Sequence, residues 1–163
     1  MKKLLFTLVF AFAGIFTANA QFWLGGSVNA AFGKHESSFG IAPEAGYSFK
    51  GTPWTVACAI DYDYTSDDVY SESMLALTPY VRYTLLSIEK FSLSMDALCG
   101  IGVRTDNSVF RVGVRPIIAW MATKKWTAAF SMGFLGYDDM YHDAQFILDF
   151  ETAAPTFGLY YNF

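Results

Sequence analysis

Bulky apolar side chains occupy every second position over long stretches of this chain. In residues 22–32 they include Phe22, Leu24, Val28 and Phe32, and the residues between them are mainly small or polar. A period of two places alternate side chains on opposite faces of a β-strand, whereas a helix has a period of 3.6. The pattern predicts eight strands, over residues 22–32, 39–49, 54–63, 75–85, 91–104, 110–120, 126–134 and 156–163.

A short phrase built on proline recurs in the strands that return from each hairpin. Pro43, Pro79 and Pro116 are each followed by an apolar residue two positions on and an aromatic residue four positions on, and Pro155 takes the like place in the last strand. One hairpin per repeat explains this recurrence and predicts antiparallel pairing. Because proline lacks the N–H that donates to a neighbouring strand, we expect bulges or unpaired carbonyl groups at these positions.

The two faces of the predicted strands differ in size. One face carries Phe, Trp, Tyr, Leu and Ile, and the other is mostly Gly, Ala, Ser and Thr with scattered charges. Side chains fill the interior of an eight-stranded barrel, so the small face belongs inside and the bulky face outside, against lipid. Only 16% of the residues are charged, against about 25% in an ordinary soluble domain. The sequence therefore predicts an all-β fold, an eight-stranded antiparallel up-and-down transmembrane β-barrel.

Aromatic residues gather at both ends of the predicted strands. Rings of this kind prefer the headgroup regions of a bilayer, so the pattern predicts two outward-facing girdles, with Phe134 and Tyr137 in one of them. Short turns are predicted at residues 50–53, 86–90 and 123–125, and longer loops at residues 34–37, 65–72, 105–108 and 138–144. In outer-membrane barrels the short turns face the periplasm, so we expect the longer loops to face the outside of the cell.

The first twenty residues have a different composition. Met1-Lys2-Lys3 precedes an apolar run from Leu4 to Phe16, and the small residues Ala18 and Ala20 stand before Gln21. This is the layout of a secretory signal peptide, and the apolar run is too short to span a bilayer as a helix. We predict cleavage after Ala20, so that residues 1–20 are a signal peptide and residues 21–163 form one barrel domain.

Net charge and cysteine content exclude two further classes of protein. A formal net charge of -4 and a pI near 5.0 leave no basic surface for nucleic acid. The two cysteines, Cys58 and Cys99, fall on strands separated by another strand. Neighbouring strands are about 4.8 Å apart, so two steps exceed the reach of a disulfide and both residues are predicted to be free thiols.

A family resemblance rests on three features of the chain. These are the strand pattern, the strands that combine proline with aromatic residues, and the terminal Tyr160-Tyr161-Asn162-Phe163. The chain resembles the small outer-membrane β-barrel proteins of Gram-negative bacteria, the group that includes OmpX and the transmembrane domain of OmpA, over the whole of residues 21–163. The resemblance implies residence in the outer membrane and contact with its lipid and lipopolysaccharide. It also implies recognition by the barrel-assembly machinery, because Tyr161 and Phe163 match the C-terminal signal of that family.

Strand parity places eight charged residues inside the predicted barrel: Glu44, Asp61, Asp63, Arg82, Asp96, Arg104, Arg111 and Arg115. Four acids and four arginines balance in charge. Because buried unpaired charge is costly, we expect a hydrogen-bonded ion-pair network that fills the lumen, with Glu44, Arg82, Asp96 and Arg115 near one level. The alternative is a narrow channel or small-ligand conduit of the porin-like class.

Catalytic and metal sites have little support in the sequence. Both histidines, His35 and His142, fall in predicted external loops, and no serine stands close to His142, which weighs against a lipid-A modifying enzyme. Acidic residues gather in two loops, but their spacing matches no calcium-binding motif, so we expect solvated side chains: Asp67, Asp68 and Glu72 in one loop, and Asp138, Asp139 and Asp143 in another. We therefore predict no catalytic residue, no metal and no cofactor.

These expectations combine into one functional hypothesis. The chain is predicted to be a monomeric, non-enzymatic integral outer-membrane protein whose external loops serve adhesion, protection or envelope integrity. The fold alone does not select among these roles, because the same barrel hosts adhesive, structural, transport and enzymatic members.

Overall fold

The computed structural model describes residues 20–32, 36–67, 71–105, 107–131, 133–140, 145–149 and 155–163. Its strands are β1 (Ala20–Phe32), β2 (Glu36–Phe49), β3 (Trp54–Asp67), β4 (Ser71–Ile88), β5 (Phe91–Arg104), β6 (Asn107–Met121), β7 (Trp126–Ser131), β8 (Phe134–Asp138), β9 (Gln145–Asp149) and β10 (Thr156–Asn162). Within these ranges no helix is long and apolar enough to cross a membrane.

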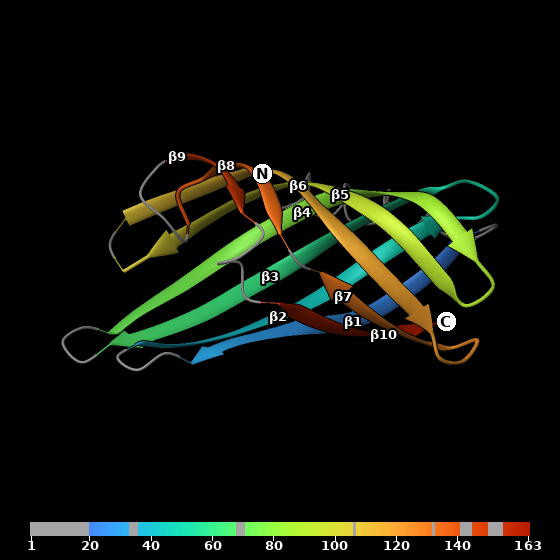
Figure 1. Cartoon of the computed structure of the whole chain (residues 1–163), viewed down its shortest axis with the longest axis horizontal. Coiled ribbons are helices and arrows are strands. Elements are labelled where there is room, and N and C mark those ends of the chain that lie inside the picture. The colour runs from blue at the N-terminus through green and yellow to red at the C-terminus, as the bar shows by residue number, and fades with distance from the viewer. Residues whose placement is uncertain are drawn as a thin grey trace, which may run out of the picture.

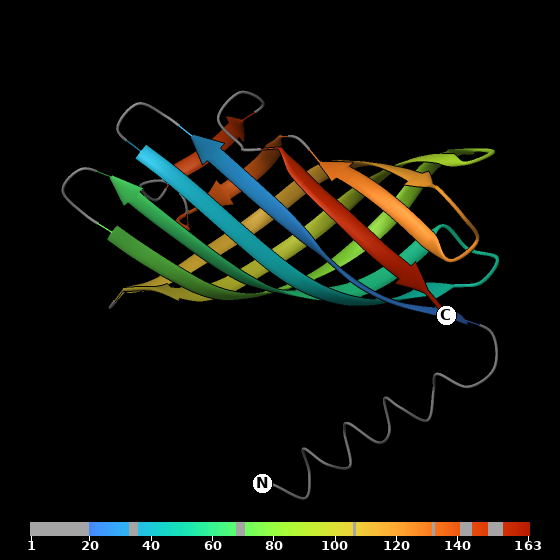
Figure 2. The ribbon, with the colours of Figure 1, turned by 90° about the horizontal axis from the view of Figure 1, so that it is seen from below.

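The strands form a closed antiparallel barrel (Figure 1 and Figure 2). Each strand from β1 to β6 pairs with the next, β6 pairs with β7, β7 pairs with β10, and β10 pairs with β1. The closing pair runs from Trp23 opposite Asn162 to Asn29 opposite Thr156. An eight-stranded barrel is what alternation predicted, and the all-β fold class is confirmed.

Residues on one strand alternate between the interior and the exterior as predicted. On β5, Leu98 is 3% exposed and Ile101 is 63% exposed, and the two differ by an odd number of positions. Interior positions on the other strands carry small and polar residues together with larger ones such as Trp23, Met74 and Ile117. The bulky apolar face is therefore the outer surface.

The seventh predicted strand, residues 126–134, is interrupted. Ile117 of β6 pairs with Ser131 of β7, and Val114 pairs with Leu135 of β8, so β6 advances three residues while its neighbour advances four. One additional residue is a β-bulge, and Gly133 within it has a φ of 88°, a conformation that glycine adopts without a Cβ clash. The bulge reverses the side-chain parity that follows it.

Phe134 is the residue that this reversal moves. It is 2% exposed and lies inside the barrel, so its predicted place in an outward-facing girdle is wrong. The outward position is taken by Leu135, which is 40% exposed. Alternation in the sequence does not reveal a bulge. One inserted residue moves every side chain beyond it to the opposite face of the strand.

Backbone pairing between strands continues further toward the loops than the alternation of apolar residues predicts. The β2, β3 and β4 strands extend into the predicted loops at residues 34–37 and 65–72. A further strand, β9, was not indicated by the alternation. It pairs with β8 from Phe134 opposite Asp149 to Asp138 opposite Gln145. Asp138 is thus the last residue of a strand rather than the first of a loop. The extensions carry polar residues, so their sequence lacks the contrast between faces that marks the barrel wall.

Three prolines coincide with interruptions in the strand pairing. The β2–β3 ladder skips Pro43, the β4–β5 ladder skips Pro79, and the bulge between β6 and β8 lies at the level of Pro116. On its other side each proline is paired. The expected local disruption is confirmed, and the barrel accommodates a missing N–H by leaving one side of the ladder open.

We expect Gly46→Ala to lower the free energy of unfolding by about 1–3 kcal/mol, as for an overpacked core. A Cβ on Gly46 would lie 2.1 Å from the Trp23 ring and 2.9 Å from the Ala57 Cβ atom. Ala97→Val is the control, because it adds two methyl groups at an exposed outward position. Chemical denaturation of the refolded protein measures both, and equal stabilities for the two variants would contradict the packing.

Candidate functional site: the polar interior of the barrel

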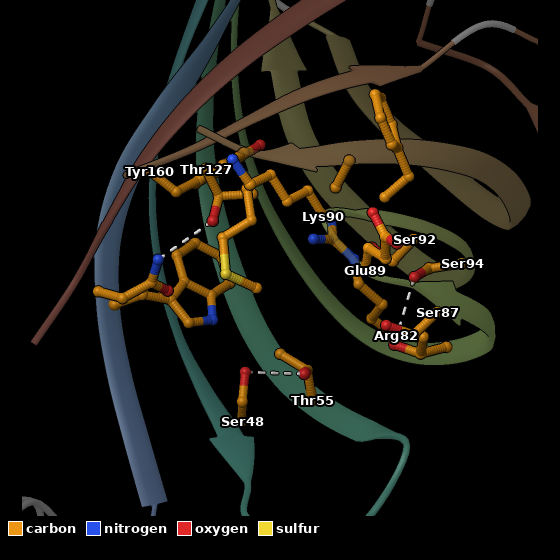
Figure 3. Close-up of a pocket in the computed structure, with 16 residues that line it drawn as sticks. Ser48, Thr55, Arg82, Ser87, Glu89, Lys90, Ser92, Ser94, Thr127 and Tyr160 are labelled. Atoms are coloured by element: carbon orange, nitrogen blue, oxygen red, sulfur yellow. Dashed lines mark hydrogen bonds between the residues drawn. The ribbon is translucent and has the colours of Figure 1, made fainter. Parts of the chain in front are cut away.

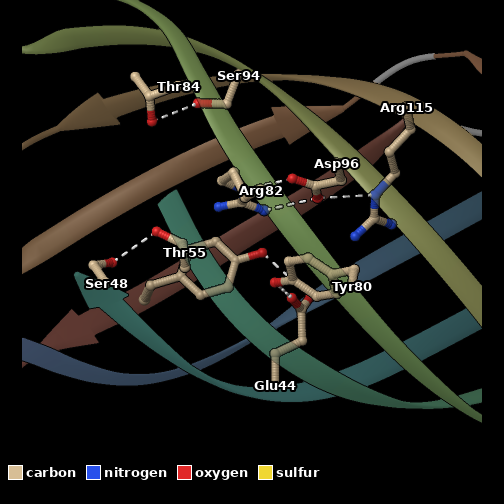
Figure 4. Close-up of polar contacts among 10 residues, drawn as sticks. Glu44, Ser48, Thr55, Tyr80, Arg82, Thr84, Ser94, Asp96 and Arg115 are labelled. Atoms are coloured by element: carbon tan, nitrogen blue, oxygen red, sulfur yellow. Dashed lines mark hydrogen bonds and ion pairs between the residues drawn. The ribbon is translucent and has the colours of Figure 1, made fainter. Parts of the chain in front are cut away.

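A buried carboxylate lies at the centre of the barrel. Glu44 on β2, drawn beside Tyr80 in Figure 4, is 4% exposed and accepts hydrogen bonds from three hydroxyl groups. Ser27 Oγ lies 2.7 Å from Oε1, Tyr80 Oη lies 2.6 Å from Oε2, and Tyr160 Oη lies 3.2 Å from Oε1. Three donors compensate the solvation that the carboxylate loses on burial.

Asp96 on β5 is the second central carboxylate and is fully buried. Arg82 contacts both of its oxygens, with Nε 2.6 Å from Oδ1 and Nη2 3.0 Å from Oδ2. Arg115 Nε lies 3.4 Å from Oδ2 on the other side. Two guanidinium groups therefore share one carboxylate, and Arg82 holds it in the short, two-pronged geometry that is strongest for arginine.

Tyr80 joins these two groups. Its hydroxyl donates to Glu44, and the guanidinium carbons of Arg82 and Arg115 lie 5.4 and 5.5 Å from the centre of its ring. Glu44 and Asp96 offset the two arginines in charge, so the layer is neutral as a unit. We call these five residues, with Tyr160, the central layer: Glu44, Tyr80, Arg82, Asp96, Arg115 and Tyr160.

A second ion pair lies nearer the loops. Arg111 Nε is 3.2 Å from Asp138 Oδ2, and the Arg111 guanidinium carbon stands 3.9 Å from the centre of the Phe134 ring. Asp138 is 1% exposed and also accepts the Met140 backbone N–H at 2.8 Å. The prediction that Asp138 is a solvated loop acid is therefore wrong, because β8 carries it into the barrel opposite Arg111.

A cluster of buried apolar side chains also lies near the loops, inside the barrel. Met140 follows β8 and is 2% exposed, although its position in the sequence indicated a loop. It packs in one buried cluster with Met74, Ala76 and Val109. Nothing in the periodicity marks Met140 as an interior residue, because it lies beyond the last strand residue that pairs with β6.

The structure places all eight charged residues of the predicted lumen set on interior positions, but it divides them into separate groups. Glu44, Arg82, Asp96 and Arg115 lie together in the central layer, joined through Tyr80. Asp61 accepts a hydrogen bond from Thr78, Asp63 Oδ1 lies 3.4 Å from Asn29 Nδ2, and Arg104 Nη2 donates to the Asp139 carbonyl oxygen at 3.1 Å. Strand parity in the sequence also places Ser27, Tyr80 and Tyr160 on the inner face. It does not indicate that their hydroxyl groups bond to Glu44.

The remaining predicted residues lie elsewhere. Tyr161 and Phe163 are outside the barrel, where the Phe163 ring packs at a tilt of 37° against the Phe22 ring, with ring centres 5.7 Å apart. Cys58 and Cys99 are free, as predicted. Glu72 is exposed, and the described ranges leave out several residues of the predicted loops: His35, Asp68, Asp106, His142 and Asp143.

The arrangement is a charge-balanced group of buried side chains joined by hydrogen bonds and ion pairs. Among the described residues, no three His, Cys, Asp or Glu side chains come together in a way that could hold a metal ion. No protein-family model matches the chain, and no curated protein matches it. Features of the interior and of the outer surface therefore carry the functional proposal below.

Replacing Asp96 tests the charge balance of the central layer. Asp96→Asn removes the carboxylate that both arginines contact, and we expect a loss of about 3–5 kcal/mol in the free energy of unfolding. Arg115→Gln should cost less, because Arg82 and Asp96 remain paired. The exposed Glu72→Gln is the control for carboxylate removal as such. Urea titration would refute the assignment if the three variants were equally stable.

Proposed function

We propose that the chain is an integral outer-membrane protein of a Gram-negative cell, with the barrel buried in the bilayer and the loops outside. The supporting observation is the composition of the outer surface. Over the described strands, the outward positions between the two barrel ends carry no charged residue, and large apolar side chains there are widely exposed, among them Leu77 (53%), Ile101 (63%) and Ile118 (52%). Soluble monomers rarely expose apolar patches beyond a few hundred Å².

The apolar surface has the height that a bilayer requires. On β5 the outward residues run from Phe91 to Val103 without a polar side chain. Twelve residue steps of an antiparallel strand span about 40 Å. A tilt of about 45° reduces this to about 29 Å, close to the hydrocarbon thickness.

Aromatic pairs encircle the end of the barrel that carries the short turns. Trp54 lies 4.7 Å from Tyr83, Phe91 lies 6.5 Å from Trp120, and Trp126 lies 5.1 Å from Tyr161, measured between ring centres. Each pair joins neighbouring strands on the outer surface. Such a girdle suits the interface between hydrocarbon and headgroups, and it supports an orientation with these turns in the periplasm.

The filled interior favours a role at the cell surface over transport. The central layer and the Met140 cluster occupy the lumen with buried side chains, so no observation favours the narrow channel or conduit. No observation favours lipid-A modification either. We propose a monomeric, non-enzymatic protein that contacts lipid and lipopolysaccharide and whose loops serve adhesion, protection or envelope integrity.

Export completes the proposal. Residues 1–20 act as the signal peptide, with cleavage between Ala20 and Gln21, and Tyr161 and Phe163 present the chain to the barrel-assembly machinery. Phe163 also closes the seam between the first and last strands, because its backbone N–H donates to the Phe22 carbonyl oxygen at 3.0 Å. These steps rest on the sequence and on the resemblance to the OmpX and OmpA group.

A charge placed on the outer surface distinguishes lipid from water around the barrel. Ala97 lies midway along β5 and is exposed, so Ala97→Arg would be nearly neutral in a water-soluble protein. In lipid vesicles we expect it to destabilise the fold by about 2–4 kcal/mol, whereas Ile88→Arg, at the turn end of β4, should cost about 0–1 kcal/mol. Denaturant titration in vesicles measures both, and the membrane assignment fails if Ala97→Arg costs no more than Ile88→Arg.

The C-terminal signal makes a prediction for cells. We expect Phe163→Ala to reduce the amount of folded barrel in the outer membrane severalfold, while the purified variant still refolds in detergent. Phe91→Ala is the control, since it removes another aromatic ring from the same end of the barrel. Heat-dependent gel migration of membrane fractions reports the folded amount. An equal loss for both variants would assign the effect to packing instead of assembly.

A further inference from the structure

A cavity of about 170 Å³ occupies the barrel interior on the turn side of the central layer (Figure 3). Arg82 and Tyr160 of the central layer line it together with Trp23, and Glu89 and Lys90 of the β4–β5 turn lie at its edge. We call it the turn-end cavity. For comparison, an engineered cavity of about 150 Å³ holds a benzene-sized molecule.

The wall of the turn-end cavity is rich in hydroxyl groups. They belong to Ser48, Thr55, Thr84, Ser92, Ser94 and Thr127. Ser48 and Thr55 are hydrogen-bonded to each other at 3.0 Å, and Ser94 donates to Thr84 at 3.3 Å (Figure 3). A hydroxyl has one hydrogen and two lone pairs, so the Thr84 hydrogen stays available to a ligand.

Two further donor groups line the cavity, the Arg82 guanidinium and the Trp23 indole. Within the described ranges, the hydrogen bonds of Arg82 run from Nε and Nη2 to Asp96, and Nη1 takes part in neither of them. Trp23 adds an indole N–H to the lining; this residue is 5% exposed and packs edge-on against Tyr160, with ring centres 5.0 Å apart. A guanidinium and an indole only donate, so the occupant they select must be rich in acceptors.

Charge points to the same class of occupant. Of the three charged residues that line the cavity, Arg82 and Lys90 are cationic and only Glu89 is anionic. Glu44 and Asp96 are not among the lining residues. An oxygen-bearing anion would accept from Arg82, Trp23 and Thr84 together, and charge-assisted hydrogen bonds of this type are about twice as strong as neutral ones.

We propose that the turn-end cavity binds a small oxyanion of the phosphate class. The proposal does not depend on what the external loops do. The oxyanion has two possible sources, a free phosphate and the phosphodiester of a lipid headgroup at the membrane surface. Both place the same oxygen atoms against the same donors, and the experiment separates them.

Trp23 provides an internal reporter for the test. The chain has four tryptophans, and the other three are exposed on the outer surface at 43–47%. A W54F/W120F/W126F variant leaves Trp23 as the sole tryptophan, in contact with the cavity. Its emission is recorded in a maltoside detergent, which carries no phosphate, during titration with inorganic phosphate and, separately, with sodium chloride at equal ionic strength.

We expect a saturable change with phosphate and none with chloride. Arg82→Gln in the same background should weaken the affinity about tenfold or more, because it removes a charged donor. Arg104→Gln is the matched control, an interior arginine outside the cavity lining, and should leave the affinity unchanged. A short-chain phosphatidylglycerol arm compares the diester with inorganic phosphate, and the tighter ligand identifies the source.

Three results would overturn the proposal: no saturable response to phosphate, an equal response to glycerol, or an unchanged affinity in Arg82→Gln. Circular dichroism verifies that each variant is folded. If Arg82→Gln does not fold, Thr84→Val replaces it, because valine keeps the shape of the threonine and removes only the hydroxyl donor. An unchanged affinity in Thr84→Val then counts against the site in the same way.

Discussion

The width of an eight-stranded barrel constrains every other feature of this protein. Such a barrel has an interior that side chains just fill, so each inward residue meets others from the opposite wall. Asp96 illustrates the consequence, because it is fully buried and reaches arginines from two neighbouring strands, β4 and β6. Burying an unpaired charge in such an interior costs several kcal/mol, because the charge loses its hydration. The central layer avoids this cost by pairing its charges.

The interior is not uniform along the barrel axis. Toward the loops it becomes apolar, with Met140 packed over Met74 and Val109, and Arg111 paired with Asp138 beside Phe134. Toward the short turns it becomes a hydroxyl-lined cavity with Arg82 at one side. The central layer separates two ends of different chemistry.

The outer surface reverses the usual distribution of a soluble protein. Its residues are large and apolar, while acids and arginines lie inside. The hydrophobic effect cannot favour this arrangement in water, since it would expose apolar area and bury charge. In a bilayer the same arrangement is favourable, because lipid takes the place of a second packed layer and the closed hydrogen-bond ladder leaves few backbone groups unsatisfied.

The sequence by itself determined the all-β class, the number of barrel strands and which face of most strands points inward. These follow from a period of two and from the contrast in side-chain size, both of which are local properties. It also placed the eight lumen charges on the inner face and located the proline interruptions. Parity says which face a residue takes, but not which residues meet.

Only the tertiary structure decided the contacts that cross the lumen and the places where parity changes. Tyr80 links Glu44 to two arginines because strand tilt and register bring β2, β4, β5 and β6 to one level, and no local pattern encodes that meeting. The bulge at Gly133 turned Phe134 inward, and the strand extension carried Asp138 to Arg111. Both depend on how β8 pairs with β6, a long-range interaction that alternation along a single strand does not contain.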